Sequence, residues 1–138
     1  MIIVVNLFMF TMALCDIRYK RLPLWGLLLF LFTGVIHSVF SDKLNMMLVI
    51  GGILLGGIFV FLSFVTREMI GYGDSLLLVG VGAWMGINYL LGVCYVAFAL
   101  GFVIAVILMI TGVNRKGTIP FVPFMLVGSL YMTYREIV

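Results

Sequence analysis

The sequence predicts an all-α membrane protein that crosses the bilayer six times. Hydrophobic residues make up 65% of the 138 residues, and only 9% are charged, against roughly 45–50% and about 25% in ordinary soluble proteins. The mean hydropathy is +1.35, and so short a chain could not bury that much apolar side chain in a water-soluble fold. Because a membrane helix needs about 20 apolar residues, the length allows six crossings with short loops.

Charged and polar residues divide the chain into six apolar segments. The charges that begin at Asp16 end the first segment, and similar short clusters end the second, third and fifth. Residues 76–113 hold no charge, are too long for one crossing, and are predicted to break near Asn88 and Tyr89. The expected spans are residues 1–15, 24–40, 44–66, 75–87 with flanking residues, 91–111 and 118–134.

The first segment is predicted to be a retained span. It lacks a basic region before it and a small-residue cleavage signature after it, which a secretory signal peptide would have. The sequence contains no internal repeat and no low-complexity linker. We therefore expect one transmembrane domain over residues 1–138.

Basic residues predict the orientation of the spans. The loops after the first, third and fifth spans share one side and hold six basic residues, whereas the other side holds Lys43 and Arg135. Because cytoplasmic loops carry an excess of Lys and Arg, the first side is expected to face the cytoplasm, with both termini outside. The six residues are Arg18, Lys20, Arg21, Arg67, Arg115 and Lys116.

The residue types exclude several kinds of site. Cys15 and Cys94 lack the spacing of a disulfide scaffold, and with His37 as the sole histidine neither a zinc site nor a Ser-His-Asp triad can be assembled. The net charge of +3 comes without a basic cluster interleaved with aromatic residues. We expect no metal, no organic cofactor and no nucleic-acid partner.

Glycines recur at four-residue spacing in two predicted spans. Gly52 and Gly56 lie in the third span, and Gly82 and Gly86 lie in the fourth. Small residues at this spacing let helix backbones approach closely in lipid. These four glycines are therefore predicted to form packing faces.

Asp74 is the most informative ionisable residue, because a charge within a membrane segment is costly and is usually kept for function. It follows Gly71, Tyr72 and Gly73 at the start of the fourth span. One interpretation is structural, with Asp74 as the N-cap of a helix behind a glycine turn. The other is functional, because the glycines remove side chains beside the carboxylate and let an extended substrate approach.

Asp16 also has two interpretations. It is either a loop acid neutralised by Arg18 or Lys20, or the partner of Asp74, since both aspartates are expected at the cytoplasmic edge of the membrane. Two facing carboxyl groups cannot easily both ionise, so they share a proton. The ionised group can then take a proton from water while the protonated group polarises a scissile carbonyl. Such a pair is typical of aspartic proteases.

Three motifs occur in order along the chain. Asp16-Ile-Arg18 precedes Leu22-Pro23, then comes Gly71-Tyr72-Gly73-Asp74, and residues 119–124 read Ile-Pro-Phe-Val-Pro-Phe. Together they resemble the type IV prepilin peptidases, which are GxGD-type intramembrane aspartic proteases.

The resemblance implies a multi-pass protein of the cytoplasmic (inner) membrane that cleaves prepilins or pseudopilins. Cleavage would occur at the cytoplasmic face, between a short basic leader and a hydrophobic helix. Asp16 and Asp74 would be the catalytic dyad that activates water, without a cofactor. The residues implied near the substrate are Gly71, Tyr72, Gly73, Pro120 and Pro123.

The chain departs from the family pattern at three places. Leu76 stands where the family commonly has lysine, and Leu24 stands where it often has asparagine. Longer members insert a cysteine-containing domain between the first spans and also N-methylate the new amino terminus, whereas the first loop here is short and has no zinc ligands. We therefore expect a peptidase without methyltransferase activity, similar to the small enzymes of Tad-type (Flp) pilus systems.

Two other functions stay open on the residues alone. One is a small proton- or ion-coupled transporter that uses Asp16 and Asp74, although transporters more often place such groups near the bilayer midplane. The other is a non-catalytic pilus assembly factor, which would tolerate exchange of both aspartates for asparagine. The sequence does not indicate an oligomeric state.

Overall fold

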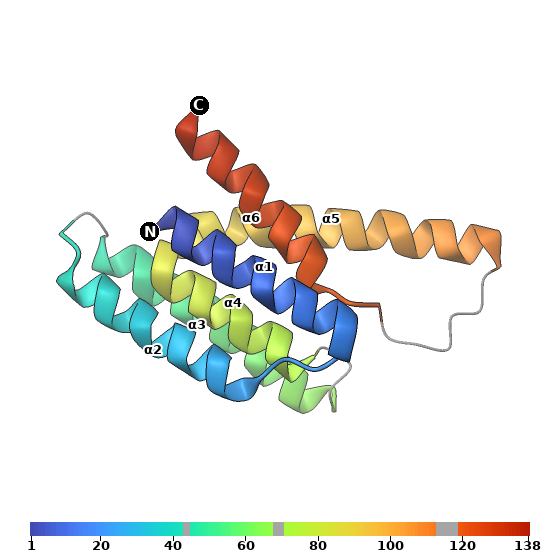
Figure 1. The fold of residues 1–138 in the computed structure, drawn as a ribbon, viewed down its shortest axis with the longest axis horizontal. Helices are drawn as coiled ribbons and strands as arrows, with labels where there is room; N and C mark the ends of the chain where they lie inside the picture. The colour runs from blue at the N-terminus through green and yellow to red at the C-terminus, as the bar shows by residue number, and fades with distance from the viewer. Residues whose placement is uncertain (43–44, 68–70, 113–118) are drawn as a thin grey trace.

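A computed structural model describes residues 1–42, 45–67, 71–112 and 119–138. This part of the chain is all-α, as predicted, and folds into six helices (Figure 1). In chain order they are α1 (Ile2–Tyr19), α2 (Leu24–Phe40), α3 (Met46–Val65), α4 (Tyr72–Met85), α5 (Ile87–Thr111) and α6 (Val122–Ile137).

Three of the described helices, α1, α3 and α5, are long and apolar enough to cross a membrane. Helix α2 is apolar but has 17 residues, while α4 and α6 have 14 and 16 residues. At 1.5 Å per residue, α4 is about 21 Å long, which is shorter than a hydrocarbon core of roughly 30 Å. A multi-pass membrane protein is therefore supported by three helices, and a crossing by each of the other three stays a prediction.

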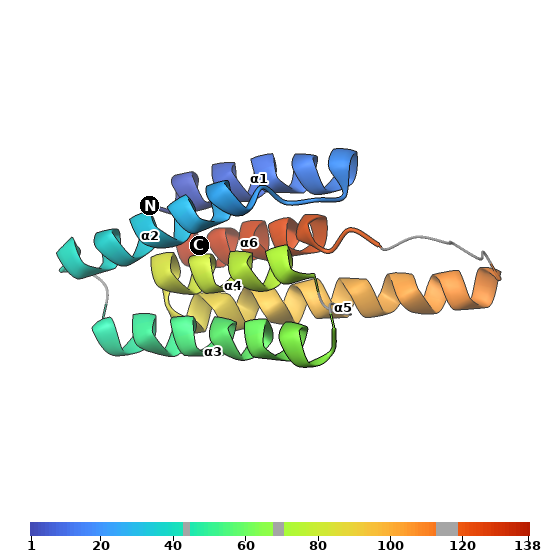
Figure 2. The same cartoon turned by 90° about the horizontal axis from the view of Figure 1, so that it is seen from below.

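Helix α4 forms the centre of the bundle. Its residues 77–84 are all buried, and α2 and α3 pack along it (Figure 2). Helix α6 packs against both α1 and α5. Because other helices surround α4 and shield it from lipid, its length need not match the thickness of the hydrocarbon core.

The four glycines lie where α3 and the α4 end pack closely, as predicted. A Cβ atom on Gly52 would lie 2.7 Å from the carbonyl oxygen of Gly82, and one on Gly56 would lie 2.6 Å from the Cα of Val79. Gly86 also lies close to α3, since a Cβ atom there would lie 3.3 Å from the Cβ of Leu48, and its φ of 80° forms the turn between α4 and α5. Only glycine adopts this conformation freely.

The end of α1 does not lie where the charged residues begin. Helix α1 continues through Asp16 to Tyr19, four residues beyond the predicted limit of residue 15. It ends because Lys20 has a φ of 51° and its N–H donates to the carbonyl of Asp16 at 2.9 Å, a left-handed C-terminal turn. Asp16 is therefore held by a helix and is not a loop residue.

Three other boundaries differ from the predictions for conformational reasons. Helix α4 begins at Tyr72 with Gly71 as its N-cap, so the interpretation of Asp74 as the N-cap is wrong. The break before α5 is at Gly86 and not at Asn88. Helix α6 begins at residue 122 and not at 118, since proline fits only the first turn of a helix.

The helices alternate in direction, so both termini lie at the same end of the bundle (Figures 1 and 2). We call this the closed end, and the opposite end, where α1 and α3 finish and α4 and α6 begin, the open end. Helix α5 continues past the open end (Figure 1). Which end faces the cytoplasm stays a prediction, and Lys43, Arg115 and Lys116, on which it partly depends, lie outside the described residues.

Candidate active site

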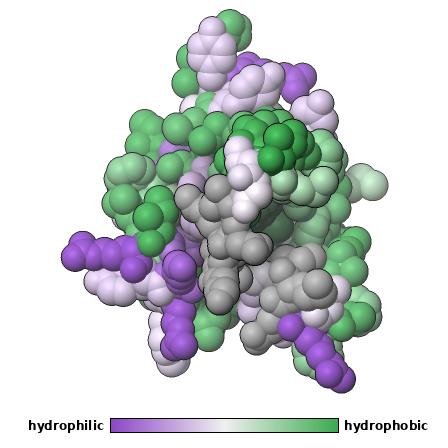
Figure 3. Space-filling model, turned by 90° about the vertical axis from the view of Figure 1, so that its right-hand side faces the viewer, coloured by the Kyte–Doolittle hydropathy of each residue, from purple (hydrophilic) through white to green (hydrophobic). Residues whose placement is uncertain are grey.

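A pocket of about 690 Å³ lies at the open end, within the range of roughly 300–1,000 Å³ typical of ligand sites. Figure 3 looks onto this end, where hydrophilic side chains gather along the lower margin and hydrophobic ones flank a hollow. Six of the seven predicted site residues line the pocket, while Pro123 lies in the first turn of α6 and is not part of the lining. The six are Asp16, Gly71, Tyr72, Gly73, Asp74 and Pro120.

Asp16 enters the pocket from the last turn of α1. One of its carboxylate oxygens accepts a hydrogen bond from the backbone N–H of Val122 at 3.3 Å. Val122 is the first residue of α6, and the N–H groups at a helix N-terminus favour an anion. The contact joins residues that are 106 positions apart, so it fixes the end of α1 against the start of α6.

Asp74 enters the pocket from the first turn of α4. A Cβ atom on Gly71 would lie 2.9 Å from its Oδ2 atom, so a larger residue than glycine at the N-cap would crowd the carboxyl group. Within the described residues, no side chain or backbone group donates a hydrogen bond to Asp74. Its carboxyl oxygens therefore remain directed at the pocket.

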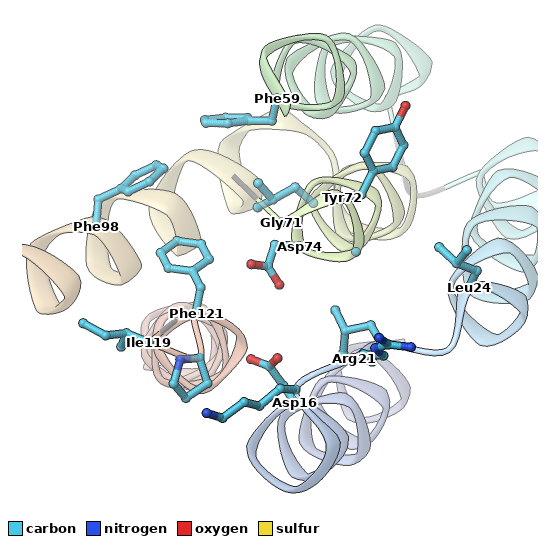
Figure 4. Close-up of a pocket in the computed structure, with 15 residues that line it drawn as sticks. Asp16, Arg21, Leu24, Phe59, Gly71, Tyr72, Asp74, Phe98, Ile119 and Phe121 are labelled. Carbon is cyan, nitrogen blue, oxygen red and sulfur yellow. The ribbon is translucent and has the colours of Figure 1, made fainter. Parts of the chain in front are cut away.

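The two carboxyl groups face one another across the pocket (Figure 4). They are near enough to interact electrostatically, although they come from helices far apart in sequence. Both side chains are half-buried. Two acids that face one another in one pocket are the kind of groups that acid–base chemistry on a peptide uses.

The two motif glycines both line the pocket, and an added Cβ atom on either would meet a close neighbour. The open face of Gly73 is turned to Leu22, because a Cβ atom there would lie 2.8 Å from Cδ1 and 2.9 Å from Cβ of that leucine. Gly71 clears space for the Asp74 carboxyl group. Tyr72 lines the pocket, but its ring points away from the two acids (Figure 4). Both glycines thus leave no room for a side chain, and the approach of a substrate beside them stays a prediction.

Ser75, the residue after Asp74, joins α4 to α3. Its buried hydroxyl lies 3.2 Å from the carbonyl oxygens of both Phe59 and Gly71, to which it donates. This bond holds the first turn of α4 against the third helix at the level of the pocket. The position of Asp74 is therefore set from two sides, by Ser75 and by Leu22 on Gly73.

Several lining residues were not singled out from the sequence. The basic pair Lys20 and Arg21 stands at one side of the pocket, and an aromatic group lines another. Phe121 lies in the motif of residues 119–124, in which the sequence does not indicate a role for this residue. Phe59 and Phe98 lie within apolar spans, where the sequence does not distinguish a phenylalanine that faces a pocket from one that faces lipid. The aromatic group consists of Phe59, Phe98 and Phe121.

No group of three or more His, Cys, Asp or Glu residues in the described part of the chain is placed to hold a metal ion. Among the described residues, the pocket lining holds two carboxylates and the basic side chains of Lys20 and Arg21. This donor set does not point to a metal site.

Residues 3–110, which include both aspartates, match the type IV leader peptidase family. The chain belongs to this family. The match ends before Pro120 and Pro123, so their expected places beside a substrate stay predictions. Leu76, where the family resemblance led us to expect lysine, is partly buried and packs against the core of this leader peptidase family member.

A longer protein is similar over almost all of the chain. The prepilin leader peptidase/N-methyltransferase of Xanthomonas campestris pv. campestris is 27% identical in an alignment 134 residues long that covers 92% of this chain and 47% of that protein. The chain thus spans about half the length of this relative. No solved structure matches the chain.

Proposed function

We propose that this leader peptidase family member is an aspartic endopeptidase that removes the short basic leader of prepilins or pseudopilins at the cytoplasmic membrane face. The observation that carries the proposal is the pair of carboxyl groups, Asp16 from α1 and Asp74 from α4, facing each other in one pocket. The family supplies the substrate class. The pocket supplies the chemistry.

In the proposed mechanism, the two acids share one proton and hold a water molecule between them. The ionised carboxylate takes a proton from water as the water oxygen attacks the scissile carbonyl carbon, while the protonated acid donates to the carbonyl oxygen. The tetrahedral intermediate then collapses with proton transfer to the leaving nitrogen. The Val122 N–H on Asp16 favours Asp16 as the group that stays ionised, since a hydrogen bond donated to a carboxylate stabilises the charged form.

We further propose that the reaction stops at cleavage. Residues 20–23 form the whole connection between α1 and α2, and they contain no cysteine. This is the place where the longer family members are expected to insert their additional domain. The new amino terminus of the product should therefore stay unmethylated.

The test is co-expression with a candidate prepilin that carries a basic leader, followed by gel shift and mass spectrometry of the product. Wild type should release the leader, and Asp16→Asn and Asp74→Asn should not. Asp42→Asn is the matched control, because Asp42 is exposed in the connection between α2 and α3 at the opposite end. Membrane insertion and thermal stability of each variant are measured in parallel.

Four outcomes would contradict the proposal. Cleavage by either variant of the pair would remove that aspartate from the dyad. Retained pilus assembly in both variants would favour the assembly factor, and a proton flux in proteoliposomes that is lost in both would favour the transporter. A product that is 14 Da heavier than expected would contradict the absence of methylation.

A further inference from the structure

The pocket has two chemically different parts. The carboxyl groups of Asp16 and Asp74, which face one another, form its polar part, and the phenyl rings of Phe59, Phe98 and Phe121 lie beside them (Figure 4). The rings come from α3, α5 and the N-cap of α6. We call these three residues the aromatic wall.

The rings of the wall are in contact with one another. The ring centroids of Phe59 and Phe98 are 5.9 Å apart with planes inclined by 29°, and those of Phe98 and Phe121 are 5.4 Å apart with planes inclined by 36°. Such offset contacts between aromatic rings are favourable. Together they make one continuous apolar surface rather than three separate side chains.

This surface faces the pocket although the same helices also carry phenylalanines that point outward. Phe61 on α3 and Phe102 on α5 are 66% and 71% exposed and do not line the pocket. Phe98 keeps 48% of its surface exposed while it touches two other rings. An apolar face left open beside polar, converging groups is the usual form of a ligand site.

The wall is fixed relative to the two acids through neighbouring residues. Ser75 follows Asp74 directly, and its hydroxyl donates to the carbonyl of Phe59 at 3.2 Å. Phe121 precedes Val122, whose N–H donates to the Asp16 carboxylate at 3.3 Å. Asp74 is thus linked to Phe59 through the hydrogen bond of Ser75, its neighbour in sequence. Asp16 is linked to Phe121 through its own hydrogen bond to Val122, the residue after Phe121. A side chain bound on the wall would have a defined position relative to the acids.

We propose that Phe59, Phe98 and Phe121 form a subsite that binds a bulky apolar side chain on the mature side of the scissile peptide bond. This inference rests on the proposed peptidase function. The wall carries no charge that could pair with a basic leader, and Lys20 and Arg21, which also line the pocket, would repel one. The apolar segment that follows the cleavage point matches the wall.

The experiment varies both partners of the contact. Wild type, Phe98→Ala and Phe102→Ala are assayed on two prepilins that carry leucine or alanine directly after the cleavage point. Phe102 is the matched control, because it lies one helical turn from Phe98 and is exposed outside the pocket. Rates on the alanine substrate correct for any loss of folded enzyme.

The expected readout is a ratio of kcat/KM values. Phe98→Ala should lower the preference for leucine over alanine by about tenfold, the scale of discrimination in an apolar pocket, and Phe102→Ala should leave the ratio unchanged. Phe98→Leu, which keeps apolar bulk, should fall between wild type and Phe98→Ala. Equal losses on both substrates in Phe98→Ala would overturn the subsite.

A third prepilin, which differs by lysine or alanine in the leader, tests whether the wall binds a cation of the leader instead of an apolar side chain. If Phe98→Ala changes the preference for lysine over alanine in the leader and not the preference after the cleavage point, the wall binds the leader, and the proposal is wrong. If wild type cleaves none of the substrates, or if Asp16→Asn still cleaves, the proposed function fails and this inference fails with it. Cleavage by wild type with unchanged ratios in Phe98→Ala overturns the subsite alone.

Discussion

At the closed end, the side chains of Asn6, Tyr89, Ser129 and Thr133 bond to one another, whereas at the open end Asp16 and Asp74 face a pocket. Ser129 donates to Asn6 at 2.6 Å, Asn6 donates to Thr133 at 2.8 Å, and the Tyr89 hydroxyl donates to the carbonyl of Ser129 at 2.9 Å. These bonds join α1, α5 and α6. We call these four residues the polar network.

The difference lies in whether polar atoms find partners inside the protein. In the polar network the donors and acceptors are satisfied by one another, so the network stabilises helix contacts in a low-dielectric setting. The carboxyl oxygens of Asp74 have no donor among the described residues, and such a group is costly to keep. A polar residue of a membrane bundle is therefore better judged by its partners than by its charge.

The largest effect is expected from exchanging aspartate and asparagine on α1, because this helix carries both Asp16, which faces the pocket, and Asn6, which belongs to the polar network. Asp16→Asn should lower the cleavage rate on the order of 10²–10⁴-fold while thermal stability stays unchanged. Asn6→Asp removes the donor to Thr133 and should lower the free energy of unfolding by about 1–3 kcal/mol, with cleavage per folded molecule unchanged. Initial rates and thermal unfolding in detergent measure both properties.

If the cleavage rate and the stability both fall in one variant, the difference between the two ends does not hold. A stability loss in Asp16→Asn would mean that the bond to Val122 is structural in the same sense as the polar network. A loss of cleavage in fully folded Asn6→Asp would mean that the closed end takes part in catalysis.

Residue types predicted the acids of the site but not the surfaces around them. Asp16 and Asp74 were visible because charges are rare in so apolar a chain, and the Gly71–Asp74 motif added order. Phe59 and Phe98 were not visible, since lipid and a pocket both accept phenylalanine. The partners of Asn6 were missed because they depend on how α1, α5 and α6 meet, which no local pattern encodes.

The fold was predicted in number and order of helices but not at the helix ends. Composition determines that a segment is helical in lipid, whereas its end depends on backbone conformation. The left-handed Lys20 ends α1 and the positive φ of Gly86 separates α4 from α5. Of these two, only the glycine carried a readable signal, and it had been assigned to packing.

The next largest effect concerns glycines that let helices approach at the closed end. A Cβ atom on Gly52 would lie 2.7 Å from the carbonyl oxygen of Gly82, and a backbone atom cannot give way as a side chain can. Gly52→Ala should therefore lower the free energy of unfolding by about 1–3 kcal/mol. Gly57→Ala on the same helix has nothing within 4 Å and should be neutral or stabilising, by up to about 1 kcal/mol. Equal melting temperatures would argue against the close approach of α3 and α4.

Removing one hydroxyl from the polar network should have a smaller effect. Tyr89→Phe keeps the buried ring but deletes the bond to the Ser129 carbonyl, so we expect a loss of about 0.5–1.5 kcal/mol in unfolding free energy and no change in cleavage per folded molecule. Tyr95→Phe is the control on α5, because Tyr95 is 78% exposed. If both changes are neutral, the network contributes no net stability.

The smallest effect is expected where a glycine meets a side chain at the open end. A Cβ atom on Gly73 would lie 2.8 Å from Cδ1 and 2.9 Å from Cβ of Leu22. Leu22 belongs to the connection that follows Asp16, so it can shift by a few tenths of an ångström without separating two helices. Gly73→Ala should therefore leave the melting temperature unchanged and reduce kcat/KM by about threefold, through a small displacement of the dyad.

The matched control for Gly73→Ala is Gly101→Ala on α5, whose added Cβ would meet its nearest neighbour, a Phe124 side-chain atom, at 4.0 Å. It should change neither quantity. If Gly73→Ala instead lowers stability as much as Gly52→Ala does, then the open end is packed as rigidly as the closed end.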